Sequence, residues 1–422
     1  METTIVGADD ASLRVASKVA AARVAFMDNL RYLMVVLVVL YHSVAAYANF
    51  APYWKIHDTS TFAVDVTREF LDVFMMPVLF FAAGYFALVS LEKRGVWEFL
   101  KDKVSRLLVP WTLAVLIIAP LLIYDQPIKP VRPFWNYWPW YLGQFEVRLR
   151  STFASVGPTT QMVYWFISLL FTFFLVFAVV YGLARKWRGP PSRPSARKIE
   201  SGTSVLTVLL GFGLLTSVAY FVLLLIVPDS SWFTLYMFLE FQVTRLVPYA
   251  CYFAFGVYAR SRGWFADGRP LGSLTLWSAI SVVLGVAYLA SGQLMFANTA
   301  GSVSLSVGYL LVFAFLRSFL LLSLLVVFVS FGIRYWNHAT EIDRQLAATS
   351  YNIYLVHFFP IIGLQEMMLE WVGGPVAIKI VIVSLGALLV SFAISRWILA
   401  RHSRAVAVAI LALFVFCLIA RP

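Results

Sequence analysis

Apolar segments long enough to cross a bilayer recur along the whole chain. A membrane-spanning helix needs about 20 predominantly apolar residues. Hydrophobic residues make up 61% of this sequence and charged residues only 13%, whereas charged residues are about 25% of an average soluble domain. The sequence therefore predicts an all-α fold, a polytopic transmembrane bundle of about 10–11 helices. The predicted spans lie near residues 29–48, 70–91, 107–123, 162–184, 204–227, 236–259, 271–292, 303–331, 350–368, 375–398 and 405–420.

The loops between these spans alternate in charge. Lys and Arg gather near residues 92–106, 185–200, 260–269, 334–344 and 396–404, whereas the loops near 228–235, 293–302 and 369–374 contain neither. Basic loops face the cytoplasm in most membrane proteins. We therefore expect a cytoplasmic tail over residues 1–25 and an extracytoplasmic C-terminus. These loops account for the net charge of +12, which does not by itself indicate nucleic-acid binding.

The first predicted span, from Phe26 to Asn49, carries two polar residues 11 positions apart, Arg31 and His42. At 100° per residue this spacing puts both side chains on one face of a helix, roughly 16 Å apart along the axis. Titratable groups inside a membrane helix are costly and usually functional. Alternatively, Arg31 anchors the helix at the lipid headgroups and a neighbouring helix satisfies His42.

Further polar residues lie inside predicted spans. His357 is at mid-depth of its segment, Arg245 and Arg317 are in apolar runs, and Asp72 is near the outer end of the second span. An arginine at the bilayer centre costs about 2.5–3.5 kcal/mol even on the lenient insertion scale. These groups therefore favour a polar cavity within the bundle. A buried pair of Arg245 with Glu240 that only locks helices together is the alternative for that arginine.

The largest predicted outer loop, residues 124–161, is rich in aromatic residues. Aromatic faces stack on sugar rings, but an interfacial aromatic belt is common to membrane proteins, and both interpretations remain open. The aromatic residues include Trp135, Tyr137, Trp138, Trp140 and Tyr141. Both cysteines, Cys251 and Cys417, lie in apolar runs, which argues against a disulfide framework or a thiolate metal site. We expect no metal.

Five segments, in order, resemble the integral-membrane acyltransferase-3 family. The arginine, ten residues and histidine of NLRYLMVVLVVLYHS resemble its first-helix signature. Met76 to Phe86 is similar to a phenylalanine-rich Gly-Tyr segment, Arg106 to Trp111 to an Arg-Leu-x-x-Pro segment, and Tyr164 to Phe166 to a Trp-Phe segment. TSYNIYLVHFFPI is similar to a late Ser-x-x-Ile-Tyr-Leu-x-His segment and includes Tyr354 and His357.

The resemblance covers residues 26–400, which we take as one transmembrane domain with residues 401–422 as an additional hydrophobic segment. Two positions depart from the pattern. Ala82-Ala83 replaces the commoner Ile-Ser before Gly-Tyr, and Phe358 replaces a second histidine of the glucan succinyltransferase branch, which we take as the nearest subgroup. These departures weaken the inference of a particular substrate from the family, but not the inference of acyl transfer.

The resemblance implies an enzyme that passes an acyl group from cytoplasmic acyl-CoA, either acetyl-CoA or succinyl-CoA, to a hydroxyl of an extracytoplasmic or lipid-linked glycan. A guanidinium at Arg31 would hold a CoA phosphate. His42 would move the hydroxyl proton, and His357 would position the acceptor or relay a proton.

The remaining candidate residues follow from the same expectation. Arg245 and Arg317 would add positive potential for the thioester or for a succinyl carboxylate. We expect Asp72, Tyr164, Trp165, Tyr354 and Glu240 to line the cavity. Alternatively, His357 only bonds a neighbouring backbone carbonyl.

Two other classes of protein remain. A secondary transporter also needs many helices and buried charges, but it usually shows paired Gly- or Pro-broken segments in related halves, and none is evident here. A membrane scaffold would leave the two histidines unexplained. We expect an enzyme of the bacterial inner membrane whose other partners are lipid and the glycan.

Overall fold

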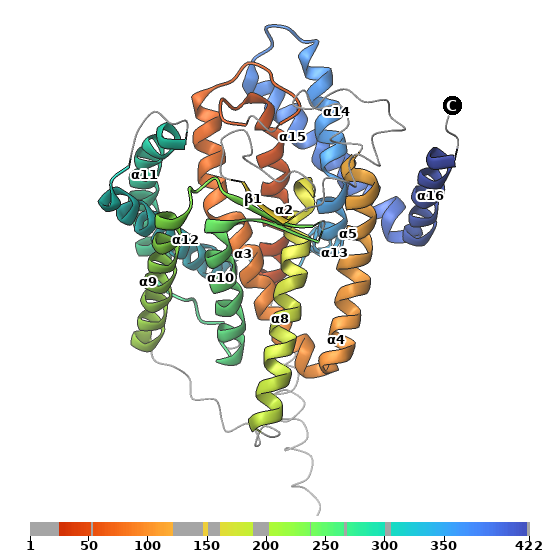
Figure 1. Ribbon diagram of the computed structural model, residues 1–422. Coiled ribbons are helices and arrows are strands. Elements are labelled where there is room, and N and C mark those ends of the chain that lie inside the picture. Colours follow the sequence, from red (N-terminus) through yellow and green to blue (C-terminus); the bar gives the residue numbers. More distant parts are fainter. Residues whose placement is uncertain are drawn as a thin grey trace, which may run out of the picture.

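The computed structural model describes residues 25–51, 54–120, 147–150, 161–188, 202–236, 238–265, 268–299 and 305–419. The predicted N-terminal tail lies outside these residues except for Ala25, with which the first described helix begins. The tryptophans and tyrosines named above for the predicted outer loop also lie outside them. Helices and strands carry the labels of Figure 1, in which α2 and α3 run through the middle of the bundle.

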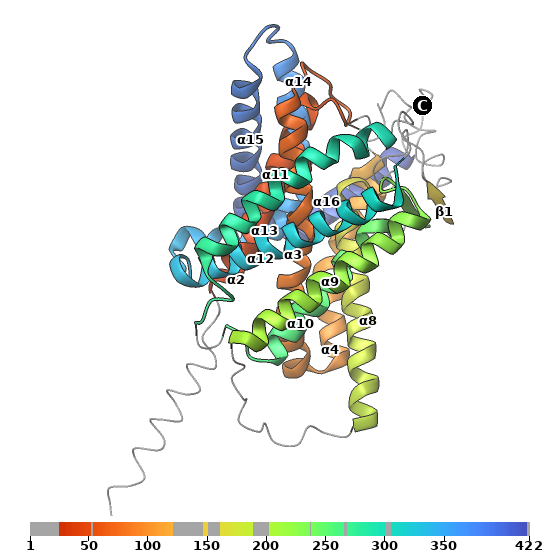
Figure 2. The ribbon, with the colours of Figure 1, turned by 90° about the vertical axis from the view of Figure 1, so that its left-hand side faces the viewer.

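Long helices dominate the described residues. In chain order they are α2 (Ala25–Ser43), α3 (Phe62–Arg94), α8 (Trp165–Arg188), α9 (Gly202–Ile226), α10 (Val243–Ser261), α11 (Leu274–Thr299), α12 (Val307–Tyr335), α13 (Glu341–Val356), α14 (Phe358–Leu369), α15 (Val376–Ala393) and α16 (Ala400–Ile419). Shorter helical segments are η1 (Ala45–Tyr47), α4 (Val96–Lys103), η2 (Val104–Leu108), α5 (Val109–Leu113), η3 (Ala114–Ile118), η5 (Met162–Tyr164) and η6 (Ile394–Leu399). Figure 2 shows α9, α11 and α12 crossing at a steep tilt to α8 and α15.

Within the described residues, seven helices are long and apolar enough to cross a membrane, or eight spans if the bent pair of α13 and α14 counts as one. The predicted all-α polytopic bundle is therefore confirmed. Two predicted segments differ in detail. Of residues 236–259, only those from Val243 onward are helical, because residues 239–242 form a strand. The segment at 107–123 is described only to residue 120, as short α and π turns.

The basic stretch 396–404, predicted as a loop, is helical instead. Residues 376–416 form one apolar helical run that passes from α15 through η6 into α16. No Gly or Pro occurs between Ala387 and Arg421, so nothing in this stretch terminates the helix. The run bends at His402, whose backbone is non-helical, and α16 lies at the edge of the bundle (Figure 1).

Two glycines allow α3 and α10 to pack backbone against backbone. A Cβ atom on Gly84 would lie 2.1 Å from the carbonyl oxygen of Phe253, and one on Gly256 would lie 2.0 Å from that of Phe81. Small residues give this kind of close approach in membrane helices, where apolar burial alone does not drive association. Any larger residue at these positions would push the two helices apart.

A small antiparallel sheet precedes α10. Its strands are β1 (Val147–Arg150), β2 (Trp232–Leu235) and β3 (Leu239–Gln242), in the order β1-β2-β3. Trp232 pairs with Gln242 and Leu235 with Leu239, so the chain doubles back between α9 and α10. This hairpin returns the start of α10 to the end of α9.

A bend of 62° separates α13 from α14 at His357. Pro360 explains its position, because a proline cannot donate to the carbonyl four residues earlier and its ring crowds that carbonyl. Val356, the last residue of α13, occupies that place. The bend puts His357 at the end of one helix and directly before the next.

Candidate functional site

His42 and His357 meet where α2 ends and α13 bends. Nδ1 of His42 lies 3.2 Å from Nε2 of His357, and the ring centroids are 5.1 Å apart. Nδ1 of His357 lies 2.7 Å from the carbonyl oxygen of Tyr354. His357 is fully buried, whereas His42 is half-buried. The structure thus brings together the two histidines that we expected to share a polar site.

The hydrogen-bond partners indicate which nitrogen of each ring carries the proton. A backbone carbonyl only accepts, so Nδ1 of His357 donates to Tyr354. Neutral His357 then has its lone pair on Nε2, and Nδ1 of His42 donates to it. Nε2 of His42 is left with a lone pair, which is the state that a general base requires.

Trp54 and Gln365 complete the surroundings of His42, and sequence reasoning missed both. The indole of Trp54 stacks on the imidazole with centroids 5.6 Å apart and an interplanar angle of 15°. Its Nε1 donates to Oε1 of Gln365 at 2.8 Å. Both residues are buried although they come from a loop and from α14. A tryptophan in a non-periodic loop gives no sequence signal for such a contact.

Arg31 lies at the other end of α2. Nη2 of Arg31 donates to the carbonyl of Ala347 at 3.0 Å and lies 3.3 Å from the Asp28 carboxylate, while 39% of the side chain is exposed. The rise of a helix puts Arg31 roughly 16 Å from His42 along the axis. Arg31 is thus held in place but remains accessible.

Further cations surround this end of α2. Burial lowers the pKa of Lys103, and although Asp102 opposes the shift, the nearby guanidiniums of Arg106, Arg94 and Arg31 lower it further. Lys103 is outside the long spans, in α4. Four cations with a few carboxylates between them give this end of the bundle a positive potential.

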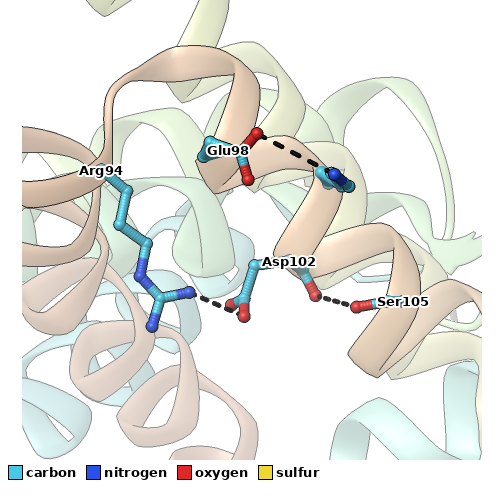
Figure 3. A pocket seen from close by; sticks show the side chains of 5 residues that line it. Arg94, Glu98, Asp102 and Ser105 are labelled. Atoms are coloured by element: carbon cyan, nitrogen blue, oxygen red, sulfur yellow. Dashed lines mark hydrogen bonds and ion pairs between the residues drawn. The ribbon is translucent and has the colours of Figure 1, made fainter.

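A cavity of about 490 Å³ opens beside these cations, between the end of α3 and α4. It is lined by Arg94, Glu98, Lys101, Asp102 and Ser105. Arg94 and Asp102 point toward one another across it (Figure 3), with Nη1 2.7 Å from the carboxylate. All five lining residues are polar or charged, and the cavity lies at the Arg31 end of α2 rather than at the histidines.

Arg245 and Arg317 belong to a separate buried network centred on Asp72. One carboxylate oxygen of Asp72 lies 2.7 Å from Nη2 of Arg317 and 3.5 Å from Nη2 of Arg245. Arg245 also lies 2.7 Å from Asp229. Arg245 therefore pairs with Asp229 and Asp72 rather than with Glu240.

Two tyrosines extend this network. Tyr220 accepts from Nη1 of Arg245 at 2.9 Å and donates to Asp229 at 2.8 Å, and Tyr288 accepts from Nη1 of Arg317. The network links α3, α9, α10, α11 and α12. The arginines that we expected to bind acyl-CoA thus have much of their hydrogen-bonding capacity engaged within the protein.

The remaining candidates lie around the start of α8 and the hairpin. Glu240 accepts from the backbone N–H of Gln161 at 3.0 Å. Trp165 stacks on Tyr249 with centroids 5.8 Å apart. Tyr164 donates to the Leu355 carbonyl at 3.1 Å, and Tyr354 donates to that of Val163. The two tyrosines fasten η5, directly before α8, to α13 beside His357, whose ring is 5.6 Å from that of Tyr354.

Comparison with known proteins identifies one family. A family model described as an acyltransferase domain, Acyl_transf_3, matches residues 24–396. The match includes Arg31, both histidines and the Asp72 network, and it ends before α16. None of the curated proteins matches the chain, and none of the solved structures does.

Proposed function

Since the chain belongs to the acyltransferase-3 family, we propose that this membrane acyltransferase moves an acyl group from cytoplasmic acyl-CoA to a hydroxyl of an extracytoplasmic or lipid-linked glycan. Acyl groups of the acetyl or succinyl type suit this role. The observation that carries the proposal is the contact between His42 and His357, which leaves Nε2 of His42 with a lone pair.

His42 acts as the general base in this proposal. Its Nε2 takes the proton of the acceptor hydroxyl while that oxygen attacks the thioester carbonyl carbon. The tetrahedral intermediate then collapses, the carbon–sulfur bond breaks, and the imidazolium returns the proton to the departing CoA thiolate. Direct transfer in this form needs no acyl-enzyme intermediate.

His357 keeps His42 in the correct tautomer. Its Nε2 accepts from Nδ1 of His42, and its own Nδ1–H is held by the Tyr354 carbonyl. An orienting group behind the base has the same role in other nucleophilic and acid–base sites. The same contact stabilises the imidazolium that forms when His42 takes a proton. His357 is therefore a positioning residue in this mechanism.

The basic end of α2 suits the CoA moiety of the donor. Arg31, Arg94 and Arg106 all lie close enough to Lys103 to lower its pKa, and guanidinium groups bind phosphate strongly. The extended pantetheine arm would cover the roughly 16 Å between Arg31 and His42. The charge pattern of the loops supports a cytoplasmic location for this end, and hence an acceptor that approaches from the other side.

The test combines cells and purified protein. Mass spectrometry of envelope glycans, from bacteria with and without the protein, should show an acyl modification that depends on it. Purified protein in liposomes, given radiolabelled acetyl-CoA or succinyl-CoA on the basic side, should transfer label to extracted glycan. Uptake of labelled glycan with no acylation would support a secondary transporter instead.

A further inference from the structure

The loop between α2 and α3 returns over the end of α2 and covers His42. Trp54, from this loop, stacks on one face of the imidazole. Phe358 lies beside both rings, with centroids 5.0 Å from Trp54 and 6.3 Å from His42. The indole thus covers one face of the imidazole and Phe358 packs against it at a steep angle of 65°, while His357 contacts its Nδ1.

Gln365 connects Trp54 to the backbone of α2. Its Oε1 accepts from Nε1 of Trp54 at 2.8 Å. Its Nε2 donates to the carbonyls of Ser43 and His42, at 2.9 and 3.3 Å. The last carbonyls of a helix have no partner within the helix, so Gln365 satisfies groups that would otherwise be unpaired. Trp54 thus stacks on the His42 ring and is hydrogen-bonded to Gln365, which in turn is hydrogen-bonded to the backbone of His42 and Ser43.

Two ion pairs fasten the part of the loop that directly follows Trp54. Nζ of Lys379 lies 2.7 Å from Asp58, and Nζ of Lys55 lies 3.3 Å from Glu366. The side chain of Lys379 is only 3% exposed and that of Asp58 only 12%, so this pair is held away from bulk water. These contacts tie the loop to α14 and α15, the helices that follow His357.

We propose that Trp54 and Gln365 are positioning residues for the acyl transfer, which hold the imidazole of His42 in the orientation where Nδ1 meets His357 and Nε2 faces the substrates. The inference rests on the proposed function, since it assigns these residues to the same reaction. A half-buried imidazole without the stacked indole would reorient, and misplacement by about 1 Å can cost on the order of a hundredfold in rate.

The kinetic test compares three variants of the full-length protein in liposomes. Trp54→Ala removes the stack, Trp54→Phe retains an aromatic face but loses the N–H donor, and Gln365→Leu removes the amide. We expect kcat to fall on the order of tenfold or more in Trp54→Ala and Gln365→Leu, and by less in Trp54→Phe. KM for acyl-CoA should change less than about twofold, because the donor-binding end is distant. Trp397→Phe and Gln345→Leu, outside the site, are matched controls and should retain wild-type kcat.

A chemical probe of His42 tests the same idea without activity. Diethyl pyrocarbonate modifies neutral imidazoles, and peptide mass spectrometry can compare His42 with the exposed His338 in each variant. We expect His42 to react on the order of tenfold faster in Trp54→Ala, and near the wild-type rate in Trp54→Phe. Unchanged labelling together with unchanged kcat in Trp54→Ala would overturn the inference. If His42→Ala retains full activity while Trp54→Ala labels faster, the proposed function fails but the positioning contact stands.

Discussion

Nδ1 of His42 lies 3.2 Å from Nε2 of His357, although the two residues are 315 positions apart in the chain. The contact depends on the end of α2 on one side and on the bend between α13 and α14 on the other. Because the Tyr354 carbonyl fixes the tautomer of His357, His357 accepts the hydrogen bond between the two rings and His42 donates it. Protons on both Nδ1 atoms leave the lone pair of His42 Nε2 available.

The role of His357 predicts unequal effects of two substitutions. His357→Leu removes the acceptor that holds His42, so kcat should fall by about 10²–10⁴-fold. His357→Gln retains a side-chain acceptor, so it should lower kcat less than His357→Leu does. In His357→Gln, the affinity for acyl-CoA should change less than kcat. Steady-state kinetics with varied acyl-CoA measure both effects. An increase in KM with unchanged kcat in His357→Leu would show that the residue binds the donor instead.

The basic end of α2 predicts a defect in donor binding. Arg31→Ala removes a charge-assisted contact, which is typically worth about 1.5–3 kcal/mol, and should raise KM for acyl-CoA by about 10- to 100-fold. Arg31→Lys should recover part of this loss. Arg344, exposed in an ion pair with Glu341, provides the control: Arg344→Ala should leave KM as it is. Loss of kcat at unchanged KM in Arg31→Ala would argue against a phosphate contact.

The Asp72 network predicts a defect in stability rather than in donor binding. Arg317 is 5% exposed and lies 2.7 Å from Asp72, and breaking a buried pair by removing one partner costs about 3–5 kcal/mol. Arg317→Leu should therefore lower the melting temperature in detergent by several degrees, since 1 kcal/mol corresponds to roughly 2–4 °C in a larger domain. If Arg317 instead holds a succinyl carboxylate, the substitution will raise KM for succinyl-CoA but not for acetyl-CoA.

The sequence was sufficient to predict the helical bundle, because lipid demands long apolar segments and tolerates few charges. The free-energy cost of placing a titratable side chain in lipid also identified His42 and His357 as candidate site residues. The sequence did not predict that Asp229 is the partner of Arg245. Glu240 is nearer in sequence, but the hairpin of β2 and β3 brings Asp229 back to the start of α10. Spacing along a chain does not predict contacts across a hairpin whose strands were not expected.

The contacts of Trp54 and Gln365 around His42 could not be predicted from the sequence either. Trp54 and Gln365 are 311 positions apart, and their hydrogen bond depends on how a loop folds against α14. Asp58 and Lys379 are 321 positions apart. No periodicity marks residues in a loop, and a lysine in an apolar segment resembles an interfacial anchor. Packing in three dimensions determined these contacts.

The loop contact predicts a pH dependence of stability. Burial opposes the charged form of Asp58, but hydrogen bonds from Lys379 and Thr59 outweigh it and hold the pKa of this carboxyl below its ordinary value. A carboxyl whose pKa is lower folded than unfolded stabilises the fold above its unfolded pKa of about 3.9, and this contribution is lost as the pH falls through the folded value. Asp58→Asn should lower the melting temperature at pH 7, and the difference from wild type should shrink below about pH 4. A constant difference across this range would exclude ionised Asp58 as the cause.

The central claim is that His42 is the base of an acyl transfer, and the most direct measurement is the turnover of His42→Ala in liposomes. Radiolabelled acyl-CoA on the basic side and extracted glycan as acceptor report the reaction, while the melting temperature and a donor-binding isotherm report folding. The account predicts that turnover falls by about 10²–10⁴-fold with the fold and the affinity for acyl-CoA retained. Wild-type turnover in His42→Ala would contradict it.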